Sequence, residues 1–487
     1  MLGKLSLAVC FAVAAVAASN LLSAAEPVRI DVATASVLNS HADQVGIWVN
    51  SIDDVARRSY AERLRSLRLR SIRYGWQFAV LDPKDLSKQR LSVDDPNLDL
   101  FFAPGGNSRE RFGPAAVGKL LGFLGASGFA VVSTDAIGYT GAADEAFGSL
   151  SPPQRKTRMA SAAADWARWG RQNGFECYEI GNENDLSGEG DKADFIRPWT
   201  PERYATVAST FMTAIKGVDP NARCGINGGL RDDAATTDWF ARIARAAPTL
   251  KQQTDFLVCH KYEMWLDYDT WRDHPEWDFG RVGQSFRQVR DEHFPTAAIH
   301  VTEIGPWKDG ENHHHYRSLL GLEMLGNVRM DAEVKHVQFW PTRWGKDGIF
   351  RPVTDPSADA QNADRLSSMG LGLAAYTRFV RDDATDVGSQ GPIRYFASSD
   401  DRGVTVTLIN HAPDPVDVRV RLDRRIDLRN PDVWRLRSAT NDPMADDTEL
   451  VSDRGDRFVA AADDGRTFEA RIGGTAALII TASKADR

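Results

Sequence analysis

Short apolar runs alternate with longer segments of helical periodicity through the first three quarters of the chain. Eight of these runs have the length and composition of buried β-strands: Val45–Asn50, Ser71–Phe78, Phe129–Asp135, Phe175–Asn182, Cys224–Asn227, Phe256–Tyr262, Ile299–Glu303 and Val334–Trp340. Helices are expected between them at Asp54–Leu67, Pro114–Ser127, Pro153–Asn173, Pro201–Val218, Thr236–Ala246 and Arg281–His293. Because strands that alternate with helices form parallel sheets, the pattern predicts a (β/α)8 TIM barrel over residues 41–381.

The pattern changes after the helical stretch Asn362–Val380. From there on, short alternating runs are separated by Asp, Gly, Asn and Pro, as in antiparallel β-sandwiches. The runs are Ile393–Ala397, Val404–Asn410, Val416–Leu422, Val433–Leu436, Arg457–Ala461, Thr467–Ile472 and Ala476–Thr481. We therefore expect residues 382–487 to form an appended β-sandwich domain. The N-terminal run Val28–Ala33, within residues 26–40, is a candidate additional strand of that sandwich.

Residues 1–25 have the organisation of a secretory signal peptide. Lys4 is their only charge, an apolar run follows from Leu5 to Ala18, and the small residues Ser23-Ala24-Ala25 precede Glu26. We expect cleavage near Ala25 and a secreted or periplasmic protein.

The composition narrows the class of partner. The 487 residues include 59 Lys and Arg and 67 Asp and Glu, and loss of Lys4 leaves 58 − 67 = −9. Such a balance, without clustered basic residues, does not favour nucleic acid as a partner. After residue 25 no run approaches the roughly 20 apolar residues of a membrane span, so we expect no membrane insertion. The oligomeric state is not readable from these features.

Three cysteines remain after residue 25, namely Cys177, Cys224 and Cys259. All three lie within apolar, strand-like runs, which is typical of buried free thiols. A disulfide between two of them would require neighbouring strands to bring the sulfurs together, and the sequence leaves that alternative open.

Two carboxylates follow the expected strands of the barrel. Functional residues of such barrels project from the C-terminal ends of the strands. Glu183, in GNEND, comes after the fourth strand and Glu303, in HVTEIG, ends the seventh. Both should therefore lie at the same mouth, from opposite sides. Glycosidic bond cleavage needs such a pair, separated by about 5–5.5 Å in retaining enzymes and about 6.5–9.5 Å in inverting enzymes. The sequence does not give that distance.

These motifs resemble the retaining glycoside hydrolases of clan A, which have Asn-Glu after the fourth strand and a second Glu at the end of the seventh. The resemblance implies that Glu183 is the general acid/base and Glu303 the nucleophile. It also implies that Asn182 holds the 2-hydroxyl of the sugar being cleaved. No cofactor and no metal are implied, and the expected partner is a poly- or oligosaccharide substrate.

Other positions of the clan pattern also have counterparts in this chain. Arg73, in SIRYGW on the second strand, stands where clan members place an Arg that pairs with the nucleophile and lowers its pKa. His260 and Tyr262, in HKYEMW, end the sixth strand, where groups that hydrogen-bond the nucleophile are expected. Trp340, in QFWPTRW, ends the eighth strand, where the resemblance implies a Trp beneath the cleaved sugar.

Further aromatic residues at or beyond the expected strand ends indicate a cleft for a long substrate, although aromatic residues also pack loops onto a barrel. They are Trp48, Trp76, Tyr139, Trp265, Trp271, Trp307 and Trp344, of which Trp48 and Trp307 are taken as candidate substrate-binding residues.

The motif EIGNE is similar to those of the arabinofuranosidase, heparanase-like and agarase/porphyranase-like families. Asn184 replaces the Pro that is common after the acid/base, and Ile304 replaces an aromatic residue after the nucleophile. The family within the clan, the sugar, the linkage and endo or exo action therefore stay open.

Two other interpretations of the cleft remain. The first is a catalytically silent carbohydrate-binding protein on the same fold, and the second is an inverting enzyme with a wider carboxylate gap.

The run His313-His314-His315 does not have the spacing of a zinc site, but one of these side chains could contact substrate. No Gly-x-Ser-x-Gly nucleophile elbow is present, which argues against an α/β-hydrolase.

Overall fold

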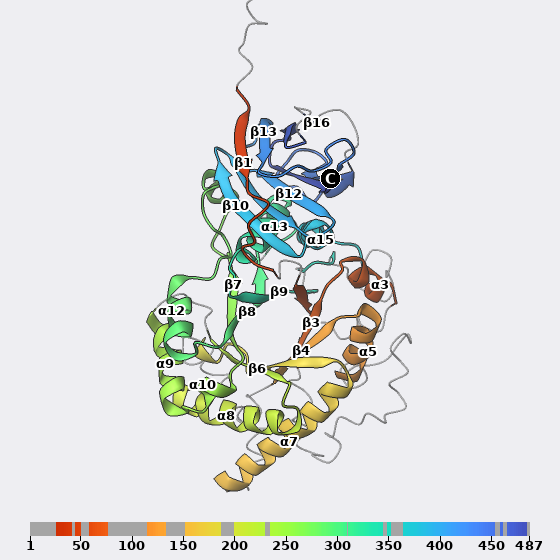
Figure 1. Cartoon of the computed structure of the whole chain (residues 1–487). Helices are drawn as coiled ribbons and strands as arrows, with labels where there is room; N and C mark the ends of the chain where they lie inside the picture. Colours follow the sequence, from red (N-terminus) through yellow and green to blue (C-terminus); the bar gives the residue numbers. More distant parts are fainter. Residues whose placement is uncertain are drawn as a thin grey trace, which may run out of the picture.

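The computed structural model describes residues 26–40, 44–49, 58–75, 114–132, 151–186, 199–228, 234–308, 310–343, 348–351, 364–452, 458–460 and 465–484. Figure 1 shows two parts stacked on each other, a barrel surrounded by helices and a smaller assembly of strands. The expected signal peptide, residues 1–25, and the aromatic residues Trp76, Tyr139 and Trp344 lie outside the described residues.

The barrel is closed and parallel, and its strands follow one another in chain order. They are β2 (Val45–Trp48), β3 (Ser71–Gly75), β4 (Ser127–Val132), β5 (Phe175–Ile180), β6 (Arg223–Asn227), β7 (Phe256–Tyr262), β8 (Ala298–Gly305) and β9 (Val334–Phe339). The circle closes where β2 pairs with β9. These strands overlap the eight predicted runs, so the predicted (β/α)8 barrel is confirmed.

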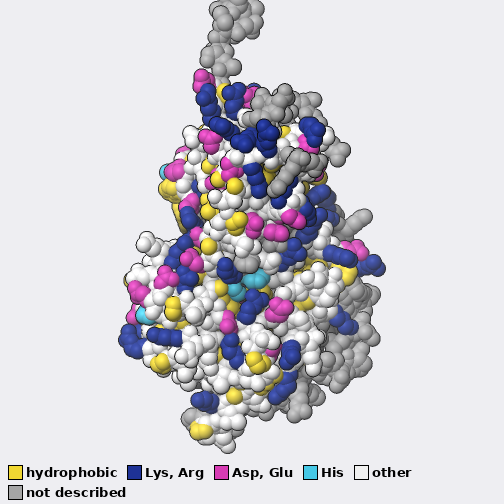
Figure 2. Space-filling model, in the orientation of Figure 1, with side chains coloured by type: hydrophobic (Ala, Val, Ile, Leu, Met, Phe, Trp, Pro, Cys, Tyr) yellow, Lys and Arg dark blue, Asp and Glu magenta, His cyan; other side chains and the backbone are white. Residues whose placement is uncertain are grey.

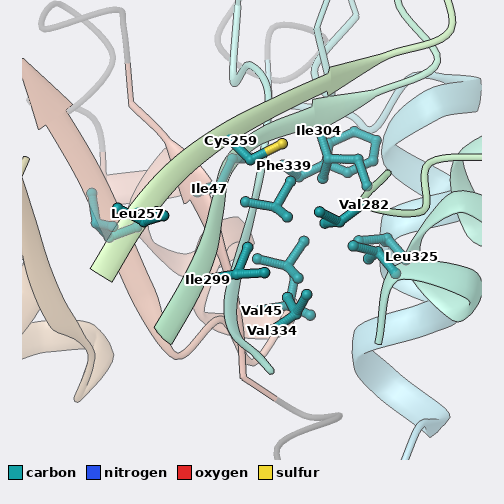
Figure 3. Packing of buried hydrophobic residues seen from close by; sticks show 14 of the residues in the cluster. Val45, Ile47, Leu257, Cys259, Val282, Ile299, Ile304, Leu325, Val334 and Phe339 are labelled. Carbon is teal, nitrogen blue, oxygen red and sulfur yellow. The ribbon is translucent and has the colours of Figure 1, made fainter. Parts of the chain in front are cut away.

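Helices cover the outside of the barrel. They are α3 (Arg58–Ser66), α5 (Pro114–Leu124), α7 (Pro152–Gln172), α8 (Pro201–Val218), α9 (Ala234–Ala246), α10 (Leu250–Gln253), α11 (Tyr268–Asp273), α12 (Gln284–His293), α13 (His315–Val328) and α15 (Ser368–Phe379). Alternate residues of the strands, such as Val45 and Ile47 of β2 and Leu257 and Cys259 of β7, belong to the same hydrophobic cluster as helix residues such as Leu325 (Figure 3). None of the helices of the described residues is long and apolar enough to cross a membrane.

Residues on the inward face of the strands change character along the barrel. Phe129 of β4, Cys177 of β5, and Phe256 and Val258 of β7 form an apolar cluster inside the barrel. The next two inward residues of β7, His260 and Tyr262, are polar and lie nearer its C-terminal end. Because side chains of a strand alternate between its two faces, every second residue of β7 points inward. These inward residues form part of the apolar interior of the barrel and part of its polar mouth.

The second part is a β-sandwich of two sheets. One sheet has the order β1-β13-β17-β16 and the other β10-β11-β12-β18-β14-β15. Their bounds are β1 (Val28–Val32), β10 (Asp383–Gln390), β11 (Ile393–Ser399), β12 (Gly403–Asn410), β13 (Val416–Leu422), β14 (Asp432–Ser438), β15 (Thr448–Ser452), β16 (Phe458–Ala460), β17 (Thr467–Ile472) and β18 (Ala476–Ser483). The appended sandwich that the sequence predicts is thus confirmed. The pairing of β1 with β13 is parallel, whereas the other strand pairs of the sandwich are antiparallel.

The larger sheet of the sandwich is buried on both faces. All residues of β12 are buried. Val404, Val406 and Leu408 point into the sandwich core, and Ile409 joins the barrel's hydrophobic cluster. On the barrel side the sheet packs against α13, every residue of which is buried. This packing holds the two parts together. The outer surface carries a mixture of basic and acidic side chains (Figure 2).

The cysteines are all buried and free. Cys177 and Cys224 lie on neighbouring strands, but Cys177 belongs to the cluster inside the barrel and Cys224 to the cluster outside it. Their side chains therefore point to opposite faces of the sheet, and the prediction of buried free thiols is confirmed.

Candidate active site

An ion-pair network fills the C-terminal mouth of the barrel. Its centre is Arg73 of β3, whose side chain is completely buried. Nη1 of Arg73 donates to Oε1 of Glu303 at 2.5 Å, and Nη2 donates to Oδ1 of Asn182 at 2.8 Å. The Arg73 guanidinium also lies over the ring of Trp48, with its central carbon 3.9 Å from the ring centroid. Arg73 thus fixes groups from β2, β5 and β8 in one geometry.

The strongest partner of Arg73 is a residue that sequence reasoning missed. Nε and Nη2 of Arg73 donate to the two carboxylate oxygens of Glu179, at 2.9 and 2.7 Å. Glu179 is fully buried on β5. The sequence did contain a signal for this residue. Glu179 follows the inward-facing Cys177 by two residues, so strand alternation points its side chain into the barrel as well. A carboxylate buried there needs a cationic partner.

Glu303 reaches the mouth because of a β-bulge in β8. Against β7, Val301 pairs with Cys259 and Glu303 pairs with the next residue, His260, so β8 has an extra residue at this point. The register with β9 also shifts between Val301 and Ile304. Strict alternation from the outward-facing Val301 would point Glu303 outward as well. The bulge re-aims Glu303 inward and lets Ile304 pack outside the barrel.

Glu183 lies in a tight turn after β5 with an unusual backbone conformation. Its φ of 50° is in the left-handed region that non-glycine residues seldom occupy. The neighbouring Asn227, at the end of β6, holds this turn: its Oδ1 accepts from the backbone N–H of Asn184 at 3.1 Å, and its Nδ2 donates to Oδ1 of Asn184 at 2.8 Å. Tyr204 of α8 bonds both strands, donating to the carbonyl of Ile180 at 2.6 Å and accepting from the N–H of Asn227 at 2.9 Å.

The two candidate catalytic carboxylates meet at His260. Nδ1 of His260 lies 3.0 Å from an oxygen of Glu183 and 3.5 Å from an oxygen of Glu303. One oxygen of each carboxylate and the ring nitrogen all lie within 4.8 Å of one another. Glu303 has a 7% exposed side chain and Glu183 a 28% exposed one. The pair is therefore close together, with Glu183 on the solvent side.

Burial controls the ionisation of Glu303. Desolvation raises the pKa of this carboxyl, and the charges of His260 and Arg73 and the hydrogen bond from Tyr262 only partly offset it. Arg73 lowers the pKa of Glu303, as expected from its opposite charge, but burial outweighs this effect and the net shift is upward. For His260, burial alone would lower the pKa, but the negative charges of Glu303 and Glu183 raise it overall.

Tyr262 and two tryptophans form the aromatic side of the mouth. The hydroxyl of Tyr262 donates a short hydrogen bond to Oε2 of Glu303, and burial raises its pKa well above the usual value. The Tyr262 ring packs edge-on against Trp340 and Trp307, with centroids 5.6 and 6.2 Å apart. The two indoles are 5.2 Å apart. All nine predicted site residues are therefore connected at one end of the barrel.

Two residues considered for the cleft rim or for substrate contact lie instead between the barrel and the sandwich. Trp271, taken as a rim aromatic, is fully buried in α11 and donates to Glu323 at 2.9 Å, because the helix turns its indole toward the sandwich. In the histidine run, His315 is buried at the start of α13 and bonds Thr448 and the carbonyl of Thr475, so it joins the barrel to the sandwich. Burial lowers the pKa of His315 to about 4.

Glu183, His260 and Glu303 are spaced as three metal ligands could be, and they are the one such group found among the described residues. The guanidinium of Arg73, 2.5 Å from Glu303, opposes a divalent cation there by charge repulsion. The donor set therefore fits acid–base chemistry better than metal binding.

No protein-family model and no curated protein matches the chain. Solved structures do match it over nearly its full length. A GH51 arabinofuranosidase from Xanthomonas axonopodis pv. citri has a TM-score of 0.63 and 14% identity, covering 94% of this chain and 99% of that one. A glycoside hydrolase family 30 subfamily 8 xylanase from Clostridium acetobutylicum has a TM-score of 0.60 and 12% identity, covering 93% and 99%.

A family 44 xyloglucanase from Paenibacillus polymyxa has a TM-score of 0.60 and 12% identity, covering 94% of this chain and 99% of that one. At these identities the likeness establishes the fold, a barrel with an appended sandwich. The resemblance to (β/α)8 glycoside hydrolases that the sequence motifs indicate is confirmed at that level.

Proposed function

We propose that the protein is a retaining glycoside hydrolase that cleaves a poly- or oligosaccharide. The observation that carries this proposal is the pair Glu183 and Glu303, with carboxylate oxygens within 4.8 Å at the mouth of the barrel. Oxygens this close suit a retaining enzyme, with carboxyl groups about 5–5.5 Å apart, better than an inverting one, with carboxyl groups about 6.5–9.5 Å apart. The similar structures, each a glycoside hydrolase by its description, support the same chemistry.

In the first step Glu303 attacks the anomeric carbon while Glu183 protonates the departing glycosidic oxygen. The C–O bond to the leaving group breaks as the ester bond to Glu303 forms. Arg73 and Tyr262 both bond the Glu303 carboxylate, so they stabilise its ionised form before attack and hold it in one orientation. In the second step Glu183 takes a proton from water, which releases the sugar with its original anomeric configuration.

The remaining residues bind and orient the sugar. The amide oxygen of Asn182 accepts from Arg73, so its nitrogen points away and donates to the 2-hydroxyl. The indoles of Trp340 and Trp307 offer apolar surfaces for the sugar's C–H face.

Residues 1–25 direct export in this proposal, which mass spectrometry of the mature N-terminus would test.

The test is a panel of polysaccharides and aryl glycosides assayed with wild-type protein and with the Glu183→Gln variant. We expect one substrate to be cut by the wild type and turnover to fall by roughly 10³-fold or more in the variant. If no glycan is cut but one binds equally to both proteins, the silent carbohydrate-binding alternative replaces this proposal.

Retention is tested with Glu303→Ala. Azide should partly restore turnover by entering the space of the lost carboxylate, giving a glycosyl azide of inverted configuration. Full activity of Glu303→Ala without azide would disprove the role of Glu303. Inverted sugar from the wild type would instead support the inverting alternative.

A further inference from the structure

The connection between β7 and α12 carries an exposed aromatic surface. Among the described residues, few large apolar side chains are strongly exposed, and three of them lie here: Met264 (42%), Trp265 (61%) and Trp277 (39%). The Trp265 and Trp277 rings are 6.2 Å apart, and His274 stacks on Trp277 at 3.8 Å. Exposed apolar side chains gathered in this way mark interaction sites.

A buried carboxylate holds this surface in place. Glu263, only 9% exposed, accepts from the indole N–H of Trp265 at 3.0 Å and from the backbone N–H of Gly280 at 2.9 Å. One side chain therefore ties the segment that bears Trp265 to the segment that bears Trp277. The indoles are held before any ligand arrives, which reduces the entropy lost on binding.

The surface lies close to the candidate active site along the chain. Trp265 is three residues after Tyr262, which bonds Glu303, so their Cα atoms are at most about 11 Å apart. The fully buried Arg317 of α13 donates to the carbonyls of Leu266 at 2.6 Å and Pro306 at 3.0 Å. It thereby locks the Trp265 loop beside the loop that carries Trp307 of the active-site mouth.

We propose that Trp265 and Trp277 form an outlying saccharide-binding surface for the part of a polymeric substrate that extends beyond the reacting bond. This inference rests on the proposed function for its occupant. Aromatic faces bordered by polar groups suit sugar rings, since a sugar presents C–H bonds to the ring and hydroxyls to the rim. The polar border here consists of Glu276 and His274, which lie 3.1 Å apart. The substrate is accordingly a chain of several sugars.

The first test compares a polymer that the enzyme cuts with the smallest aryl glycoside that it cuts. The double variant Trp265→Ala, Trp277→Ala should lower kcat/KM for the polymer roughly tenfold more than for the aryl glycoside, mainly through KM. Met444→Ala, which removes another exposed apolar side chain on the sandwich, is the matched control and should change neither value. Equal losses on both substrates, or none, would overturn the proposal.

The second test does not depend on catalysis. Native gels containing arabinoxylan, xyloglucan, agarose or heparan sulfate should slow the wild type in at least one case and slow the double variant less. If the wild type is retarded and the variant is not, but no glycan is cut, the binding surface stands and the hydrolase proposal fails. Equal retardation of both proteins, or none in any gel, would rule out the binding surface itself.

Discussion

Two buried clusters among the described residues contain a histidine and a carboxylate, and they differ in their balance of charges and in their backbone conformation. At the barrel–sandwich interface, His411 bonds Glu323 at 3.1 Å and the carbonyl of Trp271 at 2.9 Å, and its ring stacks on the Trp271 indole at 4.0 Å. At the mouth, three carboxylates lie within 4.0 Å of His260, namely Glu179, Glu183 and Glu303.

The difference lies in charge balance and backbone conformation. The interface cluster has one carboxylate for one histidine, and both side chains are completely buried. In the mouth, burial and crowding raise the pKa of Glu303, and Glu183 occupies a strained φ of 50°. Clusters with perturbed pKa values and stored strain are typical of functional sites, whereas packed clusters with one carboxylate per histidine stabilise the fold. Mutations in the two clusters test this contrast.

The largest effect is expected for Arg73→Ala. This change leaves Glu179 and Glu303 buried without their shared cation, which should cost about 3–5 kcal/mol of stability. Turnover should fall by at least roughly 10²-fold, because Glu303, the proposed nucleophile, loses its orientation. Chemical denaturation measures the loss of stability, and the glycan assay measures the loss of turnover.

Because Arg73→Ala could prevent folding, Arg73→Lys provides the second variant. Lysine keeps the charge but not the bidentate geometry, so the Arg73→Lys variant should fold and still lose turnover. Wild-type turnover in a folded Arg73→Lys protein would contradict the role given to Arg73.

Glu323→Ala should have the opposite profile. Loss of its carboxylate leaves His411 and the Trp271 N–H without their acceptor in the interior, at a cost of about 1–3 kcal/mol. Turnover measured at a temperature where the variant stays folded should match the wild type. A specific drop in kcat, with stability unchanged, would remove the distinction between the two clusters.

Asn227→Ala addresses the strained turn and should have a smaller effect. The variant loses the side-chain bonds that hold Asn184 and, through it, the conformation of Glu183. We expect kcat to fall about tenfold with little change in KM, since Glu183, the proposed acid/base, is misplaced while sugar binding is retained. The conservative variant Asn227→Asp keeps the acceptor for the Asn184 N–H and should recover part of the rate. Equal changes in kcat and KM would indicate a general structural defect instead.

Most of the fold and the site membership could be predicted from the sequence, because strand periodicity and strand ends are local signals. The helix α13 was missed since it is buried on all sides, and a helix without a polar face has no amphipathic period. The strand β10, with the sequence DATDVGSQ, lacks the alternating apolar residues that mark strands. It lies at the edge of its sheet, where pairing on one side suffices.

Within the site, the unpredicted features depend on contacts between distant strands. Simple alternation from Val301 would turn Glu303 outward, and only the pairing of β8 with both neighbours reveals the bulge. Glu179 was missed because its meaning depends on Arg73, 106 residues away. The net direction of the Glu303 pKa depends on burial, which no motif encodes.

The smallest effect concerns the pH dependence of activity and tests the mouth cluster through Tyr262→Phe. Glu303 must be ionised to attack, so activity should be lost as the pH falls through its raised pKa. The Tyr262 hydroxyl bonds the ionised carboxylate and lowers that pKa, as Arg73 and His260 also do, whereas Glu183 raises it. Removing the hydroxyl should therefore move the acid limb of kcat/KM to higher pH. Tyr316→Phe removes a comparable bond, 2.8 Å to Glu311, away from Glu303 and should leave the limb in place. If the acid limb of kcat/KM in Tyr262→Phe stays in place or moves to lower pH, a group other than Glu303 controls that limb.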